Sequence, residues 1–320
     1  MPRRKRSSSS LFTVLLAFAA NILVALAKTV AAALTGSASL VAEAAHSWAD
    51  AGNEIFLIQA ERSAAKPRDA AHPGGYGRES YVWSLFAAVG LFTAGAVVSI
   101  MHGVSALSSD EKDSDYLVGY IVLAAAAVFE GISFLQSYRQ AHAKATSSGT
   151  GTLEHVLRTS NPTLRAVFAE DSAALVGLVI AFLGLLLHQL TGNAFWDALG
   201  SILVGVLLAV VAVVLIDRNR RFLLGEPGSD RAWQIALATL LQHPEVEKVT
   251  YLHIEYVGPE QFYLVAAVDL HGNDRESDVA ADLEQIEAEL ERSSWITEAV
   301  LTLSRPGAAS LIPDAAPTPS

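Results

Sequence analysis

The chain has 320 residues, of which 52% are hydrophobic and 17% are charged. This balance is too apolar for an ordinary soluble domain and is typical of a protein that crosses a membrane several times. The sequence contains no cysteine, which excludes a disulfide framework and a thiolate metal site. The formal net charge of -11 argues against a nucleic-acid partner.

Six apolar segments, each near the length of a transmembrane helix, follow a basic N-terminal stretch at residues 1–10. In chain order they cover residues 11–34, 38–60, 82–107, 116–137, 164–190 and 195–216. The basic run could also open a signal peptide, but the first apolar segment continues to Leu34 and is long enough to span the bilayer. We therefore expect a transport domain of six transmembrane helices over residues 11–218.

Lysine and arginine are distributed unevenly between the segments that connect the expected helices. The N-terminal stretch and the connections on its side of the membrane hold nearly all of them, whereas the opposite loops hold only Lys112. The positive-inside rule then predicts that both termini lie in the cytoplasm. We expect the protein to reside in a bacterial cytoplasmic (inner) membrane.

Beyond the sixth apolar segment, residues 219–305 have the pattern of a water-exposed domain. The expected elements are a helix ending at Leu241, strands at 249–256 and 262–270, a helix capped by Ser277, and a strand at 296–303. This αββαβ order is typical of a compact α+β layer. The tail at 306–320 is rich in Ala, Pro and Ser and is expected to be disordered.

Polar residues recur at spacings of three and four in the second apolar segment, which puts most of them on one helical face. They are Glu43, His46, Asp50, Asn53 and Glu54. Ionisable groups at membrane depth cost roughly 2.5 to 3.5 kcal/mol each and usually face a partner, a cavity or an ion path. Imidazole and carboxylate bind Zn²⁺ and similar ions, and side chains at i and i+4 can reach the same ion. The stripe predicts a cation path, with interhelical hydrogen bonding as the alternative.

Four ionisable residues in other apolar segments also bear on this stripe. Glu170 and Asp171 begin the fifth segment about 100° apart on a helix, where Asp171 could supply a further ligand or both could be hydrated at the interface. Lys28 in the first segment either snorkels to an interface or meets a buried carboxylate. Glu130 in the fourth segment is a weaker ligand candidate, because it could pair with a hydroxyl or with Lys28.

These motifs resemble the cation diffusion facilitator family of divalent metal and proton antiporters, over residues 11–303. The resemblance rests on G-S-A-S-L-V-A-E-A-A-H-S-W-A-D at 36–50, H-P-G-G-Y-G-R-E at 72–79, the acidic pair at 170–171 and the C-terminal α+β domain. The runs E-D-S-A-A and Y-G-R-E-S-Y-V-W are closest to the branch that contains the mitochondrial zinc transporters.

The resemblance implies a membrane metal site of two H/D-xxx-D pairs, of which His46 and Asp50 form the first. The second pair keeps Asp171, but the position four residues earlier is Val167, which cannot bind metal. Either metal selectivity has changed or another group replaces that ligand. The candidates for the replacement are Glu170, Asn53, Glu54 and water.

The resemblance also bears on the C-terminal domain, where relatives often bind zinc. This chain has Ala280 and Ala281 at the helical ligand positions and Ser304, Arg305 and Pro306 after the last strand. His253 and His271 remain, and isolated strand histidines are more often structural than ligands. Dimerisation is therefore the role that the resemblance leaves for this domain.

We therefore expect a homodimeric exporter of divalent cations, with no enzymatic activity and no prosthetic group, that exchanges metal for protons by alternating access. Zn²⁺ is the expected substrate, and Mn²⁺, Fe²⁺ or Co²⁺ also suit a site of nitrogen and oxygen ligands. Because metal binding needs deprotonated ligands, His46 is expected to be proton-linked and Glu43 to relay protons. The alternatives are a membrane metal sensor or scaffold that binds cations without moving them and, less favoured, a transporter of an organic solute.

Overall fold

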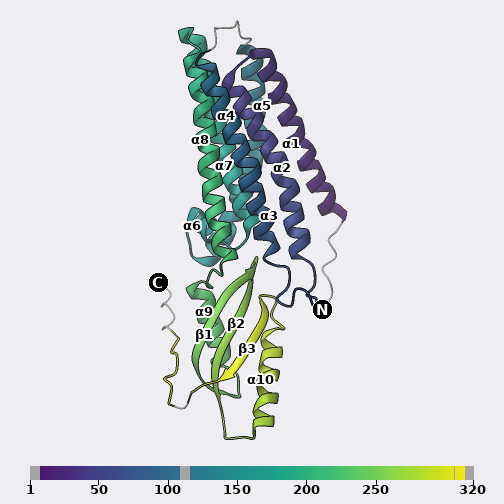
Figure 1. Cartoon of the computed structure of the whole chain (residues 1–320), viewed down its shortest axis with the longest axis vertical. Helices are drawn as coiled ribbons and strands as arrows, with labels where there is room; N and C mark the ends of the chain where they lie inside the picture. Colours follow the sequence, from purple (N-terminus) through teal and green to yellow (C-terminus); the bar gives the residue numbers. More distant parts are fainter. Residues whose placement is uncertain (1–7, 109–115, 306, 314–320) are drawn as a thin grey trace. The chain divides into compact units, whose positions relative to one another are not determined.

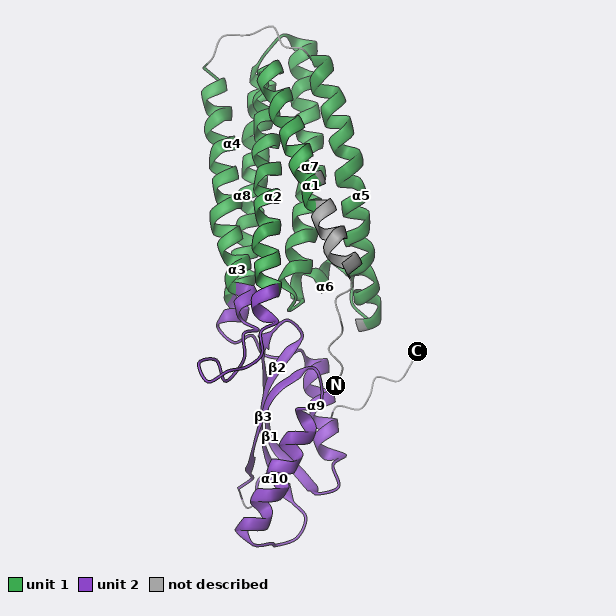
Figure 2. Cartoon of the chain, turned by 90° about the vertical axis from the view of Figure 1, so that its right-hand side faces the viewer, with its two compact units in different colours: residues 1–61, 82–220 green, residues 62–81, 221–320 purple. Residues whose placement is uncertain are grey.

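The computed structural model describes residues 8–108, 116–305 and 307–313. Contacts within the chain divide it into two compact units, drawn in different colours in Figure 2. The first unit comprises residues 1–61 and 82–220, and the second comprises residues 62–81 and 221–320. The second unit thus contains both the C-terminal domain and the segment between the second and third expected spans.

Long helices run side by side in the first unit (Figure 1). Their bounds are α1 Ser8–Thr35, α2 Ala38–Ala64, α3 Glu79–Ala87, α4 Thr93–Ala106, α5 Tyr116–Ser148, α7 Pro162–Thr191 and α8 Phe195–Leu223. A π-helical turn, Ala88–Phe92, joins α3 to α4. The sequence pattern did not predict this turn or the short helix α6, Thr152–Arg158.

Four helical stretches are long and apolar enough to cross a membrane. They are Glu79–Ala106, Tyr116–Ser147, Pro162–Thr191 and Phe195–Leu223. The apolar part of α1, Asn21–Thr35, is shorter, and α2 carries the polar stripe. All six expected spans coincide with helices, so the prediction of a helical membrane protein with a C-terminal α+β domain is confirmed.

Two glycines let α4 and α8 approach each other closely. A Cβ atom on Gly205 would lie 2.6 Å from Ile100 Cγ1 and 2.9 Å from the Ala96 carbonyl oxygen. One on Gly103 would lie 2.8 Å from the Ala198 carbonyl oxygen. Because small residues allow membrane helices to pack with their backbones close together, these positions set the spacing of this helix pair.

The carboxylate of Asp197, at the start of α8, caps the N-terminus of α2. It accepts a hydrogen bond of 2.7 Å from Ser37 Oγ, together with bonds from the Ala38 amide and the Ser39 hydroxyl. Asp197 is buried, and a negative charge is favoured where the positive end of the helix dipole lies. This side chain, which the sequence analysis did not single out, ties α2 to α8.

The C-terminal domain has the predicted αββαβ order. Its elements are α9 Asp230–Leu241, β1 Val246–Gly258, β2 Gln261–Leu270, α10 Glu276–Leu290 and β3 Ile296–Leu303. The sheet order is β1-β2-β3, with β1 antiparallel and β3 parallel to β2. Ser277 was predicted to cap α10, but the N-cap is Arg275, and the Ser277 hydroxyl instead donates to the Asp278 carboxylate; that prediction was wrong.

The strand predicted at 262–270 corresponds to β2, and alternate side chains of this strand lie in the core of the C-terminal domain. Phe262, Leu264, Ala266 and Val268 are all buried there. Part of the tail contacts the same domain, because the Leu311 amide donates a 2.7 Å hydrogen bond to the Val249 carbonyl and the Leu311 side chain packs on the core. The rest of the tail that was expected to be disordered, residues 306 and 314–320, lies outside the described residues.

Residues 62–81 bring the Gly-rich motif at 72–79 against the C-terminal sheet. Arg78 Nη2 donates a 2.7 Å hydrogen bond to Glu255 Oε1 on β1. Gly77 sits so close to the end of β1 that a Cβ atom would lie 2.5 Å from the Val257 carbonyl oxygen. In the sequence, residues 72–79 served only as a motif of the resemblance, and the structure shows that this segment packs on the sheet.

Candidate cation site between helices α2, α5 and α7

The polar stripe of α2 faces the interior of the helical unit. Glu43, His46 and Asn53 are at most 1% exposed, and Asp50 is 6% exposed. Trp48, on another face of the same helix, is 45% exposed. The helical spacing read from the sequence therefore identified the buried face correctly.

His46 and Asp50 contact each other across one helical turn. His46 Nδ1 lies 3.2 Å from Asp50 Oδ1. Within the described part of the chain, the other ring nitrogen, His46 Nε2, is buried and has no hydrogen-bond partner. A buried imidazole with a free nitrogen beside a carboxylate has the chemistry of a metal ligand or a proton acceptor.

Helix α7 brings Glu170 and Asp171 to two different neighbours. Asn53 Nδ2 on α2 donates a 2.7 Å hydrogen bond to Glu170 Oε2. Ser133 Oγ on α5 donates a 2.8 Å hydrogen bond to Asp171 Oδ1. Both carboxylates are less than 10% exposed, at 8% and 6%, which favours a role inside the bundle over hydration at an interface.

A small cavity collects carboxylates from α2, α5 and α7. It has about 50 Å³ of room for water-sized molecules, enough for an ion or a few waters. The residues that line it are Asn21, Val24, Ser47, Asp50, Glu54, Glu130, Ser133, Val167, Glu170 and Asp171. Val167 thus supplies an apolar part of the wall beside two acidic residues of its own helix.

The cavity is not a closed metal site. Within the described ranges, no three His, Asp or Glu side chains form a group that could by itself hold a metal ion. One oxygen each of Glu54 and Asp171, Oε2 and Oδ2, is buried there without a hydrogen-bond partner among the described residues. The ligand set predicted from the sequence, with Glu170, Asn53 and Glu54 as candidates beside Asp171, therefore stays a prediction.

Lys28 on α1 is fully buried and paired with two acids. Its Nζ lies 2.9 Å from Glu43 Oε2 and 3.7 Å from Glu130 Oε1. Snorkelling to an interface, one of the two interpretations of this lysine, is therefore wrong, and the pairing of Lys28 with a buried carboxylate is confirmed. Glu130 correspondingly contacts Lys28 while it also lines the cavity.

Sequence reasoning missed two polar partners of the acidic residues. Asn21 Nδ2 on α1 donates a 2.8 Å hydrogen bond to Glu54 Oε1, and Ser133 holds Asp171 as described above. Each is a polar residue inside an apolar run, and that interruption was the available signal. The pattern could not show which acid each residue meets.

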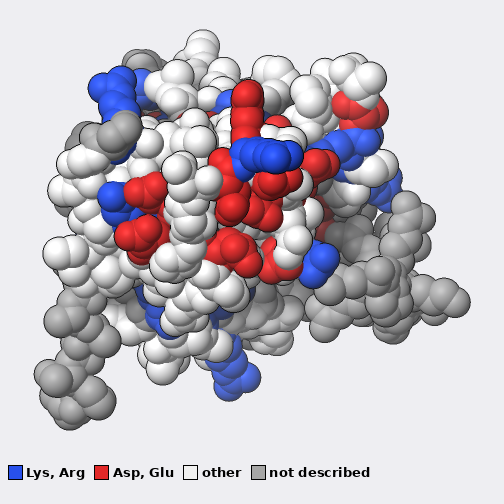
Figure 3. Space-filling view, turned by 90° about the horizontal axis from the view of Figure 1, so that it is seen from below, with Lys and Arg blue, Asp and Glu red and all other residues white. Residues whose placement is uncertain are grey.

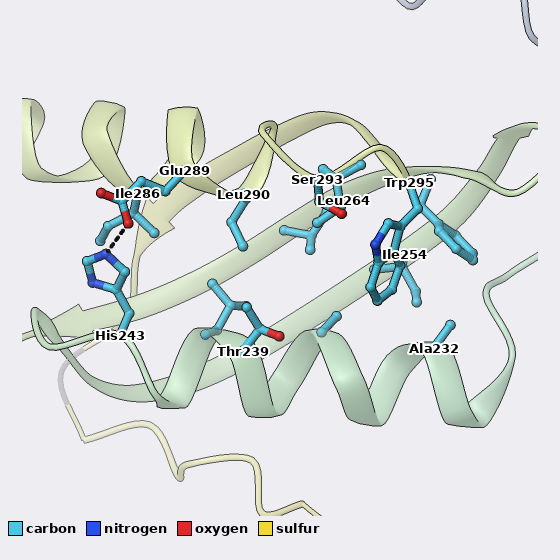
Figure 4. A pocket seen from close by; sticks show the side chains of 14 residues that line it. Ala232, Thr239, His243, Ile254, Leu264, Ile286, Glu289, Leu290, Ser293 and Trp295 are labelled. Carbon is cyan, nitrogen blue, oxygen red and sulfur yellow. Dashed lines mark ion pairs between the residues drawn. The ribbon is translucent and has the colours of Figure 1, made fainter. Parts of the chain in front are cut away.

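The C-terminal domain has a separate, mostly apolar cavity of about 230 Å³ between α9, α10 and the sheet. Figure 4 shows His243 and Glu289 pointing toward each other at one end, with His243 Nε2 3.4 Å from Glu289 Oε2. His253 and His271 are exposed on other parts of this domain. Neither histidine lines the cavity.

Acidic side chains gather on the face seen in Figure 3. Helix α10 alone carries six acidic residues and no basic one. Many of them are exposed, including Glu276, Asp278 and Glu284. Helix α10 thus contributes a strongly acidic part of the surface of the C-terminal domain.

Comparison with known proteins gives the family. Residues 14–224 match the cation efflux transmembrane domain. Metal tolerance protein C4 of Arabidopsis thaliana is 35% identical over 233 residues, which is 73% of this chain and 51% of that protein. The mitochondrial proton-coupled zinc antiporter SLC30A9 of Mus musculus is 32% identical over 259 residues, which is 81% of this chain and 46% of that protein.

The Homo sapiens protein of the same name is 31% identical over 274 residues, which is 84% of this chain and 48% of the human protein. The chain thus spans about half the length of these curated relatives. The resemblance drawn from the motifs at 36–50, 72–79 and 170–171 is confirmed, including its relation to the mitochondrial zinc transporter branch. The matched domain and these relatives show that the chain belongs to the cation efflux, or cation diffusion facilitator, family.

Proposed function

We propose that this protein is a secondary transporter, not an enzyme, that exports divalent metal ions in exchange for protons, with Zn²⁺ as its main substrate. The observation that carries the proposal is the buried contact between His46 and Asp50 beside a cavity that also holds Glu170 and Asp171. Membership of the cation efflux family supports metal transport, and the names of the mouse and human relatives support zinc and protons.

In this proposal, the metal ion enters the cavity between α2 and α7 and binds Asp50 and Asp171. Asn53 and Ser133 orient the two acids of α7, as outer partners do for the ligands of metal sites. His46 is the third ligand, and Glu170, Asn53, Glu54 or water takes the place that Val167 leaves open, after a small rearrangement of the helices. Alternating access would then expose the same ligands to each side of the membrane in turn.

Proton exchange follows from the chemistry of these ligands. A carboxylate or an imidazole must be deprotonated to bind metal, so binding expels protons and protonation from the far side promotes release. His46 is the proposed proton-linked ligand. Glu43 is the proposed relay, and its Oε1 is buried without a hydrogen-bond partner among the described residues.

We further propose that the transporter is a homodimer, held by the C-terminal domain, in a bacterial inner membrane with both termini in the cytoplasm. The uneven distribution of Lys and Arg supports this orientation. The proposed domains are residues 1–10, 11–218, 219–305 and 306–320, as the sequence indicates. Mn²⁺, Fe²⁺ and Co²⁺ remain alternative substrates of a site without thiolates.

The test is metal uptake by proteoliposomes under a proton gradient, with Zn²⁺ and Mn²⁺ supplied separately. Asp50→Ala and His46→Ala should abolish or strongly reduce uptake that the natural chain shows. Trp48→Phe is the matched control, because Trp48 lies on the exposed part of the same helix. Stoichiometric metal binding without uptake by the natural chain would instead identify a membrane metal sensor or scaffold.

A further inference from the structure

The transport scheme gives no role to the buried ammonium group of Lys28. This residue is fully buried, and its Nζ is 2.9 Å from Glu43 Oε2 and 3.7 Å from Glu130 Oε1. An ammonium group has three donors and no lone pair, so Lys28 cannot bind the metal itself. Its effect on the site must act through its charge.

The position of this charge connects it to the cation site. Glu43 lies one helical turn before His46 on α2, and Glu130 lines the same cavity as Asp50. Charges in the low-dielectric interior of a protein influence one another far more strongly than charges in water.

A purely structural pair would not need this arrangement. A buried ion pair is in general weak support for stability, because desolvation of both groups offsets much of their attraction. One carboxylate would be enough to pair Lys28 with a neighbouring helix, yet two share the ammonium, and one of these also faces the cavity. The contacts therefore place the Lys28 ammonium group between an acid of the α2 stripe and an acid of the cavity.

We propose that Lys28 is a tethered cation that sets how tightly the site holds a divalent metal. Its ammonium group offsets the charge of Glu43 and Glu130, and it thereby weakens metal binding enough for the ion to leave. A transport site must bind its ion strongly enough for entry and weakly enough for release. This inference rests on the proposed function and assigns the residue that tunes its affinity.

The experiment compares the charge variants of one ion pair. Lys28→Met removes the ammonium group at similar size, Lys28→Arg keeps the charge, and Glu43→Gln removes one negative charge while Lys28 remains. The dissociation constant for Zn²⁺ is measured by calorimetry on the purified full chain, and KM and kcat are measured in proteoliposomes. Lys144→Met is the control, because this lysine is exposed at the other end of α5 from Tyr116.

Lys28→Met should lower both the dissociation constant and KM about tenfold, equivalent to about 1.4 kcal/mol, and should also lower kcat because the metal leaves slowly. Glu43→Gln should shift the dissociation constant about tenfold the other way. Lys28→Arg should stay close to the natural chain. The double variant Lys28→Met/Glu43→Gln, whose net charge equals that of the natural chain, should recover most of its affinity.

If Lys28 had only a structural role, each variant would lower the yield of folded protein or kcat. Lys28→Met and Glu43→Gln would then not shift the dissociation constant for Zn²⁺ in opposite directions. Unchanged affinity in folded Lys28→Met would overturn the proposal. If Lys28→Met does not fold, a Glu43→Gln variant with unchanged or tighter binding would overturn it as well. A natural chain that binds Zn²⁺ without transporting it would refute the proposed transport function. The dissociation constants of the variants would still test the proposed role of Lys28, so the two proposals can be distinguished.

Discussion

The side-chain amide of Asn53 donates a 2.7 Å hydrogen bond to Glu170 Oε2 and thereby joins α2 to α7 beside the cavity. Both residues are buried, at 1% and 8% exposure. A carboxylate in such a place keeps one orientation only while its hydrogen-bond partner is present. In the second ligand pair, Val167 stands where relatives have a ligand. The contact with Asn53 holds Glu170, an acidic residue of the same cavity wall, in a defined orientation.

Replacing Asn53 with alanine should therefore weaken metal binding. Glu170 loses its donor and its fixed orientation, and loss of such an outer partner typically costs about 10- to 100-fold in metal affinity. Calorimetric titration of Zn²⁺ into the purified variant measures this effect. Asn273→Ala, at an exposed loop residue of the C-terminal domain, serves as the control. An affinity equal to that of the natural chain would show that Glu170 takes no part in binding.

A carboxylate at position 167 should change the metal preference. Val167 lines the cavity four residues before Asp171, so Val167→Asp adds an oxygen ligand one helical turn away. Carboxylate ligands suit harder ions such as Mn²⁺, and we expect the Mn²⁺-to-Zn²⁺ uptake ratio to rise by about tenfold. Competitive uptake with both metals measures the ratio, with Val167→Ala as the control for lost volume. An unchanged ratio would mean that the bound metal does not reach this wall.

Asp197→Ala should destabilise the helical unit. Asp197 accepts bonds from Ser37, Ala38 and Ser39, and the substitution leaves these buried donors at the start of α2 without their acceptor. Losses of this kind cost about 1–3 kcal/mol. Thermal unfolding in detergent should therefore show a lower midpoint. Asp274→Ala, at an exposed loop residue, should leave the midpoint unchanged. Equal midpoints for both variants would contradict the capping role.

Gly77→Ala should weaken the packing of the loop between α2 and α3 on the C-terminal sheet. The new Cβ atom would meet the Val257 carbonyl oxygen at 2.5 Å and the Gly258 Cα at 2.8 Å, so the backbone has to move. Faster hydrogen exchange across residues 62–81, measured on the full chain, is the expected result. Gly74→Ala is the matched control, because a Cβ atom there has open space around it. Unchanged exchange in Gly77→Ala would show that the loop tolerates the displacement.

The conformation of the loop between α2 and α3 should depend on pH through Asp69. Hydrogen bonds from the Tyr76 hydroxyl and from the backbone amides of His72 and Ala71 lower the pKa of this exposed carboxyl group. A lowered pKa in the folded state means that these contacts stabilise the turn above the ordinary value of about 3.9 and are lost as the pH falls through the lowered pKa. The turn should accordingly be intact at neutral pH and open in acid.

Tyr76→Phe tests this coupling because it removes the largest cause of the shift. The pKa of Asp69 should rise toward its ordinary value, and a carboxyl NMR titration of the full chain in micelles measures it. Tyr263→Phe, at a residue of β2, provides the comparison. An Asp69 pKa that is the same in both variants would show that the Tyr76 hydroxyl does not hold the carboxylate.

The sequence by itself determined the features that depend on local periodicity. Long apolar runs predicted the helices, the spacing of three and four predicted that His46 and Asp50 share a buried face, and alternation predicted β2. These inferences succeeded because a helix or a strand repeats with a fixed period, and burial selects one side of it. The ends of elements were predicted less accurately, as the wrong cap at Ser277 shows.

Only the tertiary structure decided which residue each buried group meets. Asn53 and Glu170 are 117 positions apart in the sequence, and Arg78 and Glu255 are 177 apart. A periodic pattern shows which face of a helix is buried, and it does not show which neighbouring helix lies against that face or at what height. Lys28 is the clearest case, since its sequence position suits both snorkelling and pairing, and only the packing of α1 against α2 and α5 places its ammonium group between two acids.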